Sequence, residues 1–279
     1  MSIVPRLFEL YRQRGFTVVS GLNPTHWRGL NSAPFTWLMR DGRSYTNGLG
    51  IALQEVFFLE SLFSHYHPRR LFVIGNSFGW SAVTLALLNP AAEIVAIDAG
   101  FDEYASDGLD LTNAIARAAG LKLTAVKGVS PQDVAGTLAR SFDQPVDFAF
   151  IDGYHSNEQI VLDFRAIRPH ASPDAVYLFH DAHEFDLYEG LARIEAESGL
   201  ELRRLLATPS GMAVAYPAAL AATLAPTLDV FAPDAAALAM ISRATWRHAH
   251  PTRAKYTRSA LKRLNTIRGW IGKPPLPLP

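Results

Sequence analysis

Short apolar runs alternate with amphipathic stretches through the middle of the chain. We interpret the runs as buried strands at residues 71–74, 93–98, 121–126, 146–151 and 175–179. Apolar positions at helical spacing predict helices over residues 51–65, 81–89, 110–119, 131–142 and 158–167. Residues 202–208 and 212–216 flank a Pro-Ser-Gly turn and predict an antiparallel hairpin. The predicted fold class is therefore α/β: a doubly wound, mostly parallel, seven-stranded sheet with an antiparallel terminal hairpin.

Both ends of the chain lack this regular alternation. Residues 1–46 mix prolines, tryptophans and charges, and we interpret them as an N-terminal lid or cap. Residues 47–216 carry the alternation and form the predicted core. Residues 217–279 are first rich in alanine and then basic, which predicts a helical C-terminal extension.

A glycine turn separates the first strand of the core from the helix that follows it. Gly75 and Gly79 permit a tight reversal that can present backbone N–H groups to a ligand. The spacing lacks the glycine that lets a dinucleotide pyrophosphate approach, so a nicotinamide or flavin cofactor is disfavoured. Asp98 ends the next strand about 20 residues later, as expected of a carboxylate that binds ribose hydroxyls. An ordinary strand-turn-helix corner is the alternative.

Acidic and imidazole side chains follow two later strands. They are Asp152, His155, His180 and Asp181. Because parallel strands end at the same edge of a sheet, we expect these side chains to converge with the glycine turn. For an Asp at a strand end, capping of the next helix is the alternative role.

Composition excludes several kinds of site. The chain has no cysteine, so zinc–thiolate sites, disulfides and a cysteine nucleophile are all ruled out. Its start lacks the apolar core of a signal peptide, and no uninterrupted apolar run approaches the length of a membrane span. We therefore expect a soluble, cytoplasmic protein.

Four segments, in this order, resemble the class I S-adenosylmethionine-dependent methyltransferases. The likeness is to the small-molecule O-methyltransferase branch, whose fourth strand ends in Ile-Asp-Gly-x-His-Ser and whose fifth ends in His-Asp. It covers about residues 47–216 and implies a Rossmann-like methyltransferase fold. The segments are VIGNSFGWSA at 73–82, ID at 97–98, FIDGYHSNE at 150–158 and LFHDA at 178–182.

The resemblance implies where S-adenosylmethionine binds. The glycine turn would wrap the methionine end, Asp98 and Ala99 would lie at the ribose, and Asp152 would be a further contact. Residues 128–130 would border the adenine. The implied cofactor-binding residues are Gly75, Asn76, Ser77, Gly79, Asp98, Ala99, Gly128, Val129, Ser130 and Asp152.

The sequence departs from the family pattern at three positions. Val73 stands where an acid commonly contacts the cofactor's amino group. Metal-dependent relatives have oxygen ligands where this chain has Tyr154 and Ala182. Asp152 and Asp181 are therefore metal candidates that are short of protein oxygens. Mg²⁺ can complete its shell with water, but we expect most activity to survive chelation.

The implied function is transfer of a methyl group to a hydroxyl of a small molecule, of a sugar or secondary-metabolite type. His155 is the first choice for the base because an imidazole titrates near neutral pH. Asp152, Asp181 and His180 are further catalytic candidates, with His183 after them. A non-catalytic S-adenosylmethionine-binding protein of the same fold is the alternative, and a nucleotide-dependent oxidoreductase ranks below it.

Charge is distributed unevenly although the formal net charge is zero. Every Asp and Glu lies at or before Asp234, whereas residues 243–273 carry only basic charges. A basic helix over residues 252–271 could dock on the acidic body or contact an anionic membrane surface. The zero net charge argues against nucleic acid as a partner, while the small-molecule acceptor and a homo-oligomer fit the sequence.

Overall fold

The computed structural model describes residues 2–27, 29–101, 104–249, 251–270 and 273–276. The chain forms two compact units, Met1–Ala232 and Pro233–Pro279. The first unit contains the sheet that the sequence predicts.

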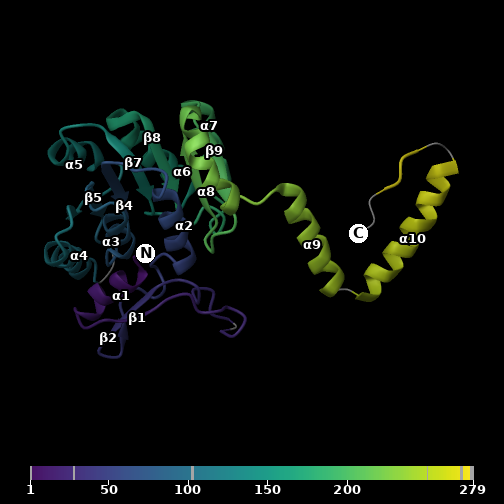
Figure 1. Ribbon diagram of the computed structural model, residues 1–279, viewed down its shortest axis with the longest axis horizontal. Helices are drawn as coiled ribbons and strands as arrows, with labels where there is room; N and C mark the ends of the chain where they lie inside the picture. The colour runs from purple at the N-terminus through teal and green to yellow at the C-terminus, as the bar shows by residue number, and fades with distance from the viewer. Residues whose placement is uncertain (1, 28, 102–103, 250, 271–272, 277–279) are drawn as a thin grey trace. The chain divides into compact units, whose positions relative to one another are not determined.

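A seven-stranded sheet forms the centre of the first unit (Figure 1). Its order is β6-β5-β4-β7-β8-β10-β9; the first five strands run parallel, and β10 pairs antiparallel with β8 and β9. This arrangement confirms the predicted fold class. The strands are β4 (Arg70–Ile74), β5 (Glu93–Asp98), β6 (Leu123–Lys127), β7 (Val146–Ile151), β8 (Ala171–Phe179), β9 (Glu201–Leu205) and β10 (Met212–Tyr216).

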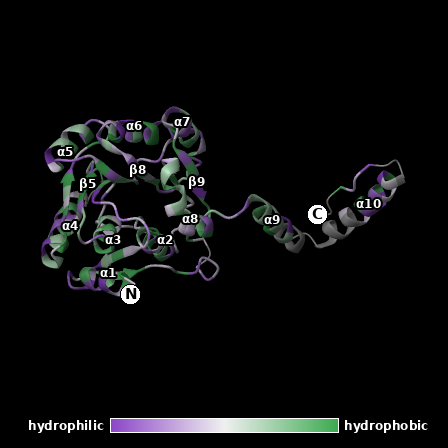
Figure 2. Cartoon of the chain, turned by 45° about the horizontal axis from the view of Figure 1, so that its top comes forward, coloured by the Kyte–Doolittle hydropathy of each residue, from purple (hydrophilic) through white to green (hydrophobic). Residues whose placement is uncertain are grey.

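Helices cover both faces of this sheet and bury two separate apolar clusters against it (Figure 2). The strands therefore have apolar side chains on both faces, which is why they read as continuous apolar runs. One face is covered by α1 (Val4–Arg12), α2 (Leu53–Phe63), α3 (Trp80–Leu88), α4 (Ala105–Ala119) and α8 (Ala221–Phe231). The other is covered by α5 (Val134–Ser141), α6 (Asn157–Ile167) and α7 (Tyr188–Ser198). Short 3-10 helices, η1 (Arg168–His170) and η2 (Ala218–Leu220), join neighbouring elements.

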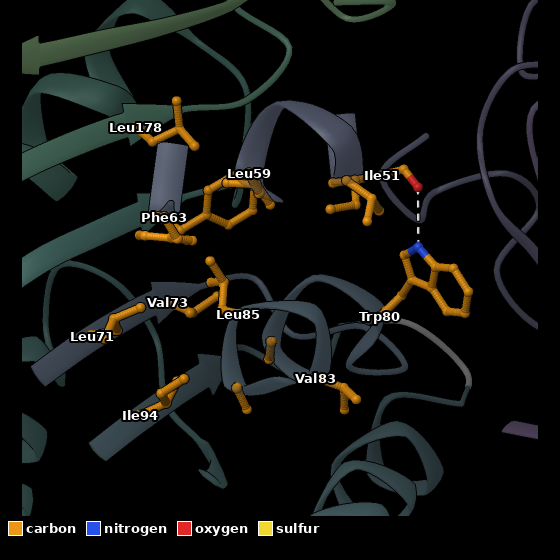
Figure 3. Close-up of a cluster of buried hydrophobic side chains, with 14 of the residues drawn as sticks. Ile51, Leu59, Phe63, Leu71, Val73, Trp80, Val83, Leu85, Ile94 and Leu178 are labelled. Carbon is orange, nitrogen blue, oxygen red and sulfur yellow. Dashed lines mark hydrogen bonds between the residues drawn. The ribbon is translucent and has the colours of Figure 1, made fainter. Parts of the chain in front are cut away.

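Trp80 ties the start of α3 to the chain that leads into α2 (Figure 3). Its indole Nε1 donates a hydrogen bond to the carbonyl of Ile51 at 3.1 Å. The rings of Phe8 and Tyr11, from α1, lie 5.4 and 5.1 Å from the Trp80 ring. Tyr11 also donates its hydroxyl hydrogen to the carbonyl of Phe78 at 2.9 Å. The N-terminal helix is thus packed into the core beside the glycine turn.

The N-terminal region also contains a small antiparallel sheet that the sequence did not reveal. Its strands are β1 (Thr17–Val19), β2 (Trp37–Arg40) and β3 (Arg43–Ser44). They are too short to show a clear alternation of apolar and polar residues. Helix α7 was not predicted either.

One stretch, Ala218–Thr245, has the length and composition of a membrane span, with a mean hydropathy of 1.4. The structure breaks it at residues 232–234, between α8 and α9. Within α8, Leu224, Leu228 and Phe231 are buried in the core of the first unit. The stretch is therefore divided between the two units.

The second unit consists of α9 (Ala235–Ala249) and α10 (Pro251–Trp270), followed by an extended segment. Helix α10 agrees with the helix predicted over residues 252–271. Among the side chains of α10 that the structure describes, Leu264 and Ile267 are exposed.

Candidate functional site

Strand register brings the loops after β4, β7 and β8 to one edge of the sheet. Ile74 pairs with Ile151, and Ile151 pairs with Phe179. The ladder continues one residue further, because Asp152 N donates to Ile74 O at 2.9 Å and His180 N donates to Ile151 O at 3.0 Å. The polar residues predicted at these strand ends therefore lie next to the glycine turn.

The glycines of this turn are required by close packing. Gly75 has φ +94°, and a Cβ there would lie 1.9 Å from the carbonyl oxygen of Asp152. Gly79 has φ +76°, and a Cβ there would lie 2.1 Å from Thr112 Oγ1 on α4. The turn thus presses directly on the loop after β7 and on α4.

Asp98, at the end of β5, braces the turn through its side chain. One carboxylate oxygen accepts hydrogen bonds from Asn76 N at 3.0 Å and Ser77 N at 2.8 Å. The other accepts one from Gly100 N at 2.8 Å. A carboxylate offers about four acceptor positions, so these three bonds leave room for a ligand hydroxyl.

A cavity of about 1100 Å³ opens at this edge of the sheet. It is lined by every predicted site residue except Gly79 and His183, and Gly79 packs against Thr112 instead. The predicted residues in its wall are Gly75, Asn76, Ser77, Asp98, Ala99, Gly128, Val129, Ser130, Asp152, His155, His180 and Asp181.

The opposite wall comes from the N-terminal region, at residues 29–32, Phe35 and residues 46–50. Aromatic side chains add to it near the opening: Tyr154 is 77% exposed and Phe185 is 50% exposed. Phe185 stacks on the His155 ring with centroids 4.8 Å apart and planes 17° from parallel. The cavity therefore has a polar side on the sheet edge and a partly apolar side formed by loops.

Asp152, His155, His180 and Asp181 meet in one cluster, with one ligand-type atom from each lying within 4.8 Å of the others. His180 Nδ1 is 3.0 Å from an oxygen of Asp152 and 3.1 Å from one of Asp181. His155 Nε2 is 3.4 and 3.6 Å from the same two carboxylates. Neither nitrogen has a hydrogen-bond partner among the described residues.

Glu55, on α2, lies behind this cluster and is fully buried. One carboxylate oxygen is 3.2 Å from His180 Nε2 and accepts a hydrogen bond from Ala52 N at 2.8 Å. The other accepts from the backbone N–H of Ser210 at 3.2 Å and from the Ser210 hydroxyl. Sequence reasoning missed Glu55, although it stands in the apolar stripe of its helix, four residues from Ile51 and from Leu59.

These contacts shift the pKa values of the buried groups. Burial alone lowers the pKa of His180, but Asp152, Glu55 and Asp181 together raise it well above its ordinary value. Burial alone raises the pKa of Glu55, but His180 and the bonds from Ser210 and Ala52 bring it below the ordinary value. The pKa of Asp152 is likewise lowered, because the two histidines outweigh its burial. The cluster therefore favours ionised groups.

Other residues considered from sequence lie elsewhere. His183 contacts the Tyr188 hydroxyl and is absent from the described cavity wall. Val73 is fully buried in the core, and Ala182 is buried in the cluster that packs under α7. Tyr154 lines the cavity opening.

The donor atoms of the cluster suit a divalent ion. Mg²⁺ prefers an all-oxygen shell, whereas here two carboxylates are joined by imidazole nitrogens, which suit first-row transition ions. Asp152, Asp181 and His180 are the residues that would hold such an ion.

A family model described as "Methyltransferase domain" matches residues 72–182. This segment runs from within β4 to the first residues of the loop after β8, so it contains the glycine turn, Asp98 and the four-residue cluster. A comparison with curated protein sequences finds no significant match.

Solved structures of methyltransferases are similar to this chain at low identity. The O-methyltransferase TomG from Streptomyces achromogenes, in complex with S-adenosylmethionine, has 18% identity and a TM-score of 0.46, over 60% of this chain and 80% of that one. An O-methyltransferase from Bacillus cereus, in complex with S-adenosylhomocysteine, has 16% identity and a TM-score of 0.46, over 77% and 91%. A methyltransferase from Geobacter sulfurreducens has 15% identity and a TM-score of 0.45, over 59% and 78%.

These TM-scores are below 0.5, so the assignment is based on the matched domain and on the sheet itself. The matched segment supplies the parallel half of the sheet and the loops at its carboxyl edge, where open α/β sheets bind ligands. By this match, residues 72–182 of the chain are similar to a methyltransferase domain.

Proposed function

We propose that the protein transfers the methyl group of S-adenosylmethionine to a hydroxyl oxygen of a small molecule, such as a sugar or a secondary metabolite. One observation carries this proposal: a single cavity joins the glycine turn and Asp98 to the cluster around His155. A cofactor and an acceptor can therefore lie side by side in it, as an in-line transfer requires.

The cofactor half is the wall from the glycine turn to residues 128–130. Asp98 retains acceptor capacity for the ribose hydroxyls beyond its three backbone bonds. Asn76 and Ser77 would lie at the methionine end, and Gly128 to Ser130 at the adenine. Because Val73 is buried in the core, it makes no polar contact with the cofactor's amino group.

The acceptor half is the side formed by His155, the two carboxylates and the N-terminal loops. His155 lies within 3.6 Å of both Asp152 and Asp181. The two carboxylates flank the nitrogen that would take the proton of an acceptor hydroxyl. Phe185 stacks on the ring and holds its plane.

The reaction needs one proton acceptor and correct positioning. The acceptor oxygen forms a bond to the methyl carbon as the bond from that carbon to sulfur breaks, and the sulfonium becomes a neutral thioether. The hydroxyl proton moves to His155 Nε2. A bound divalent ion would supply positive charge that favours the ionised form of a nearby hydroxyl.

Binding of S-adenosylhomocysteine, followed by calorimetry, tests the cofactor half. Asp98→Ala should weaken binding more than tenfold, or by roughly 1.5–3 kcal/mol, because a charged acceptor is lost. Asp174→Ala, an exposed acid at the start of β8, is the matched control and should bind like the wild type. Unchanged affinity in a folded Asp98→Ala protein would contradict the placement of the ribose.

Turnover with a panel of hydroxylated acceptors, measured across pH, tests the acceptor half. His155→Ala should lower turnover by about 10²–10⁴ with cofactor affinity nearly intact. His65→Ala, an exposed histidine after α2, should leave turnover unchanged. A protein that binds S-adenosylhomocysteine and methylates none of the acceptors would favour the alternative function, a non-catalytic cofactor-binding protein.

A further inference from the structure

We propose that the methyl acceptor carries an ammonium group, which the carboxylate of Glu184 and the exposed ring of Tyr154 receive at the opening of the cavity. This assignment rests on the proposed function, because it concerns the half of the cavity that binds the acceptor. Two observations carry it: the charge of the cavity wall and the apolar and aromatic side chains exposed around the opening.

The described wall of the cavity is rich in carboxylates. Among the described residues, no Lys or Arg lines it. An acceptor with a phosphate or carboxylate group would bring like charges together where water is largely excluded, whereas an ammonium group is complementary to this wall. The acidic residues that line the cavity are Asp98, Asp152, Asp163, Asp181 and Glu184.

Glu184 is the carboxylate that lacks a described counter-charge. The raised pKa of His180 makes that ring a cation, which lies 3.0 Å from Asp152 and 3.1 Å from Asp181. Glu184 is not a member of their cluster, and none of the ion pairs between described residues includes it. Burial, and then the negative charge of Asp181, raise the pKa of Glu184. A cation beside Glu184 would relieve this unfavourable charge.

Backbone contacts hold Glu184 in the cavity wall. Glu184 N donates to Ser210 O at 3.3 Å, and His183 N donates to Gly211 O at 3.0 Å. Both acceptors belong to the turn between β9 and β10. This turn packs so closely that a Cβ at Gly211 would lie 2.2 Å from the Cβ of His183. The Glu184 side chain therefore starts from a fixed position at the opening.

Exposed apolar side chains gather around the same opening. Exposed apolar residues that cluster at one place mark a binding surface, and the faces of Tyr and Phe rings also attract ammonium groups. Because Phe185 stacks on His155, Tyr154 is the ring that we assign to the ammonium. The exposed apolar residues of the cavity wall are Leu49, Phe101, Tyr154, Leu162 and Phe185.

Unpaired polar atoms mark this cavity as a ligand site independently of its charge. His180 Nδ1 and Asp163 Oδ2 are buried without a hydrogen-bond partner among the described residues, and both side chains belong to the cavity wall. His180 is 3% exposed and Asp163 is 1% exposed. Such atoms are uncommon in folded proteins unless a ligand or water completes them. The cavity is thus suited to a ligand with polar groups as well as an apolar part.

Three phenols that differ only at the end of a two-carbon side chain test the charge preference. Tyramine ends in an ammonium, 4-ethylphenol in a hydrogen and 3-(4-hydroxyphenyl)propanoate in a carboxylate. Calorimetric titration of the full chain at pH 7, with and without S-adenosylhomocysteine, should give affinities that fall in this order. Tyramine should bind about 3–10-fold more tightly than 4-ethylphenol, since an exposed ion pair and a cation–π contact each contribute modestly. High salt should reduce this advantage and leave 4-ethylphenol affinity unchanged.

Variants at exposed positions assign the preference to its residues. Glu184→Gln removes the charge and keeps the size of the side chain, so it should remove most of the advantage of tyramine over 4-ethylphenol. Glu189→Gln changes an exposed acid of α7 outside the described cavity wall and should bind all three phenols like the wild type. Tyr154→Leu keeps an apolar side chain without the ring, so it should lower tyramine affinity by about 2–5-fold and 4-ethylphenol affinity less. Thermal melting of each variant establishes that it is folded.

Several results would overturn the proposal. They are equal affinity for tyramine and 4-ethylphenol at low salt, tighter binding of the propanoate than of tyramine, and no detectable binding of tyramine. A preference for tyramine that Glu184→Gln leaves unchanged would overturn the assignment to Glu184. The proposed function fails by different results, because it requires S-adenosylhomocysteine binding and methyl transfer, and the ranking of the three phenols measures neither.

Discussion

At the scale of single residues, the first unit holds charged side chains in places where burial is costly. Glu55 and His180 compensate each other, and the bonds from Ser210 and Ala52 complete the arrangement. Asp163, on α6, differs from them. One of its oxygens accepts from Ser130 Oγ and from Gln159 Nε2, while the other is buried without a partner among the described residues.

Asp163 should make stability depend on pH. Burial raises the pKa of this carboxyl, so its ionisation disfavours the folded state. The wild type should therefore gain stability as pH falls from the raised folded pKa toward the unfolded value near 4. Asp163→Asn keeps the accepting oxygen and removes the charge, so it should melt at a higher temperature than the wild type at pH 7, with the difference shrinking toward pH 4.

Thermal melts of both proteins between pH 4 and 8 check this expectation. Asp174→Asn, at an exposed position on β8, serves as the control for removal of one negative charge. A lower melting temperature of Asp163→Asn at pH 7 would contradict the prediction, because it would mean that hydrogen bonds to the ionised carboxylate outweigh the cost of its burial.

At the scale of elements, the glycine turn depends on contacts that the sequence does not display. The spacing of Gly75 and Gly79 suggested a turn that frees N–H groups for a ligand. In the structure, Asn76 N and Ser77 N are bonded to Asp98, and Gly79 packs against Thr112 on α4. The turn is therefore held by its neighbours before any ligand arrives.

Gly79→Ala should destabilise the protein by about 2–5 kcal/mol. A left-handed backbone costs a residue with a Cβ about 1–2 kcal/mol, and the added carbon would lie 2.1 Å from Thr112 Oγ1, an overpacking cost of about 1–3 kcal/mol. Gly120→Ala is a matched control, because Gly120 has φ +67° with no atom within 4 Å of the added carbon.

Denaturant unfolding of the two variants separates strain from packing. Gly120→Ala should lower the free energy of unfolding by only about 1–2 kcal/mol, since it adds the backbone cost without a packing cost. Equal losses of unfolding free energy in the two variants would show that α4 shifts to make room for the extra carbon.

The elements predicted correctly are those whose pattern is set by burial. Strands β4, β5 and β7 are apolar on both faces, so their sequences identify them without reference to any partner. Helix α7 was missed because it has few buried apolar positions and includes Gly190, a poor helix former. A Cβ at Gly190 would lie 2.6 Å from the carbonyl of Asn157, so this glycine serves a contact with α6 that only the tertiary structure reveals.

The candidate site likewise contains residues that the sequence pattern identifies and residues that it does not. Asp98, Asp152, His155, His180 and Asp181 were found because they end strands, and parallel strands share an edge. Glu55 and Ser210 were not found from the sequence. They lie on α2 and on the turn between β9 and β10, which reach the cluster only through packing of the folded chain. A charged residue in an apolar helical stripe was the signal available for Glu55.

At the scale of the whole molecule, the buried apolar cores lie within the first unit. Among the described residues, neither cluster contains a member beyond Ala232. The second unit carries the basic charges of residues 243–273, and Met240 and Ile241 of α9 are exposed. Its docking on the body, or on an anionic membrane, stays a prediction from sequence.

Deleting residues 233–279 removes no described member of either apolar core, so the melting temperature should stay within about 2–4 °C of the full chain, the shift that about 1 kcal/mol produces in a domain of this size. Binding of S-adenosylhomocysteine should also be retained. The docking interpretation predicts instead a clearly lower melting temperature. Sedimentation of both proteins with anionic and with neutral vesicles tests the membrane interpretation, which requires binding that is lost with the tail and weakened by salt.

Glu55 also links distant parts of the sequence. It contacts His180 across 125 residues and Ser210 across 155 residues. Contacts of such long range form only after the chain has closed large loops, and they are among the slowest steps of folding. A nascent or partly folded chain that has built the parallel strands but has not yet added the final hairpin would present His180 without its support. The cluster around His180 would then be completely braced only in molecules that have finished folding.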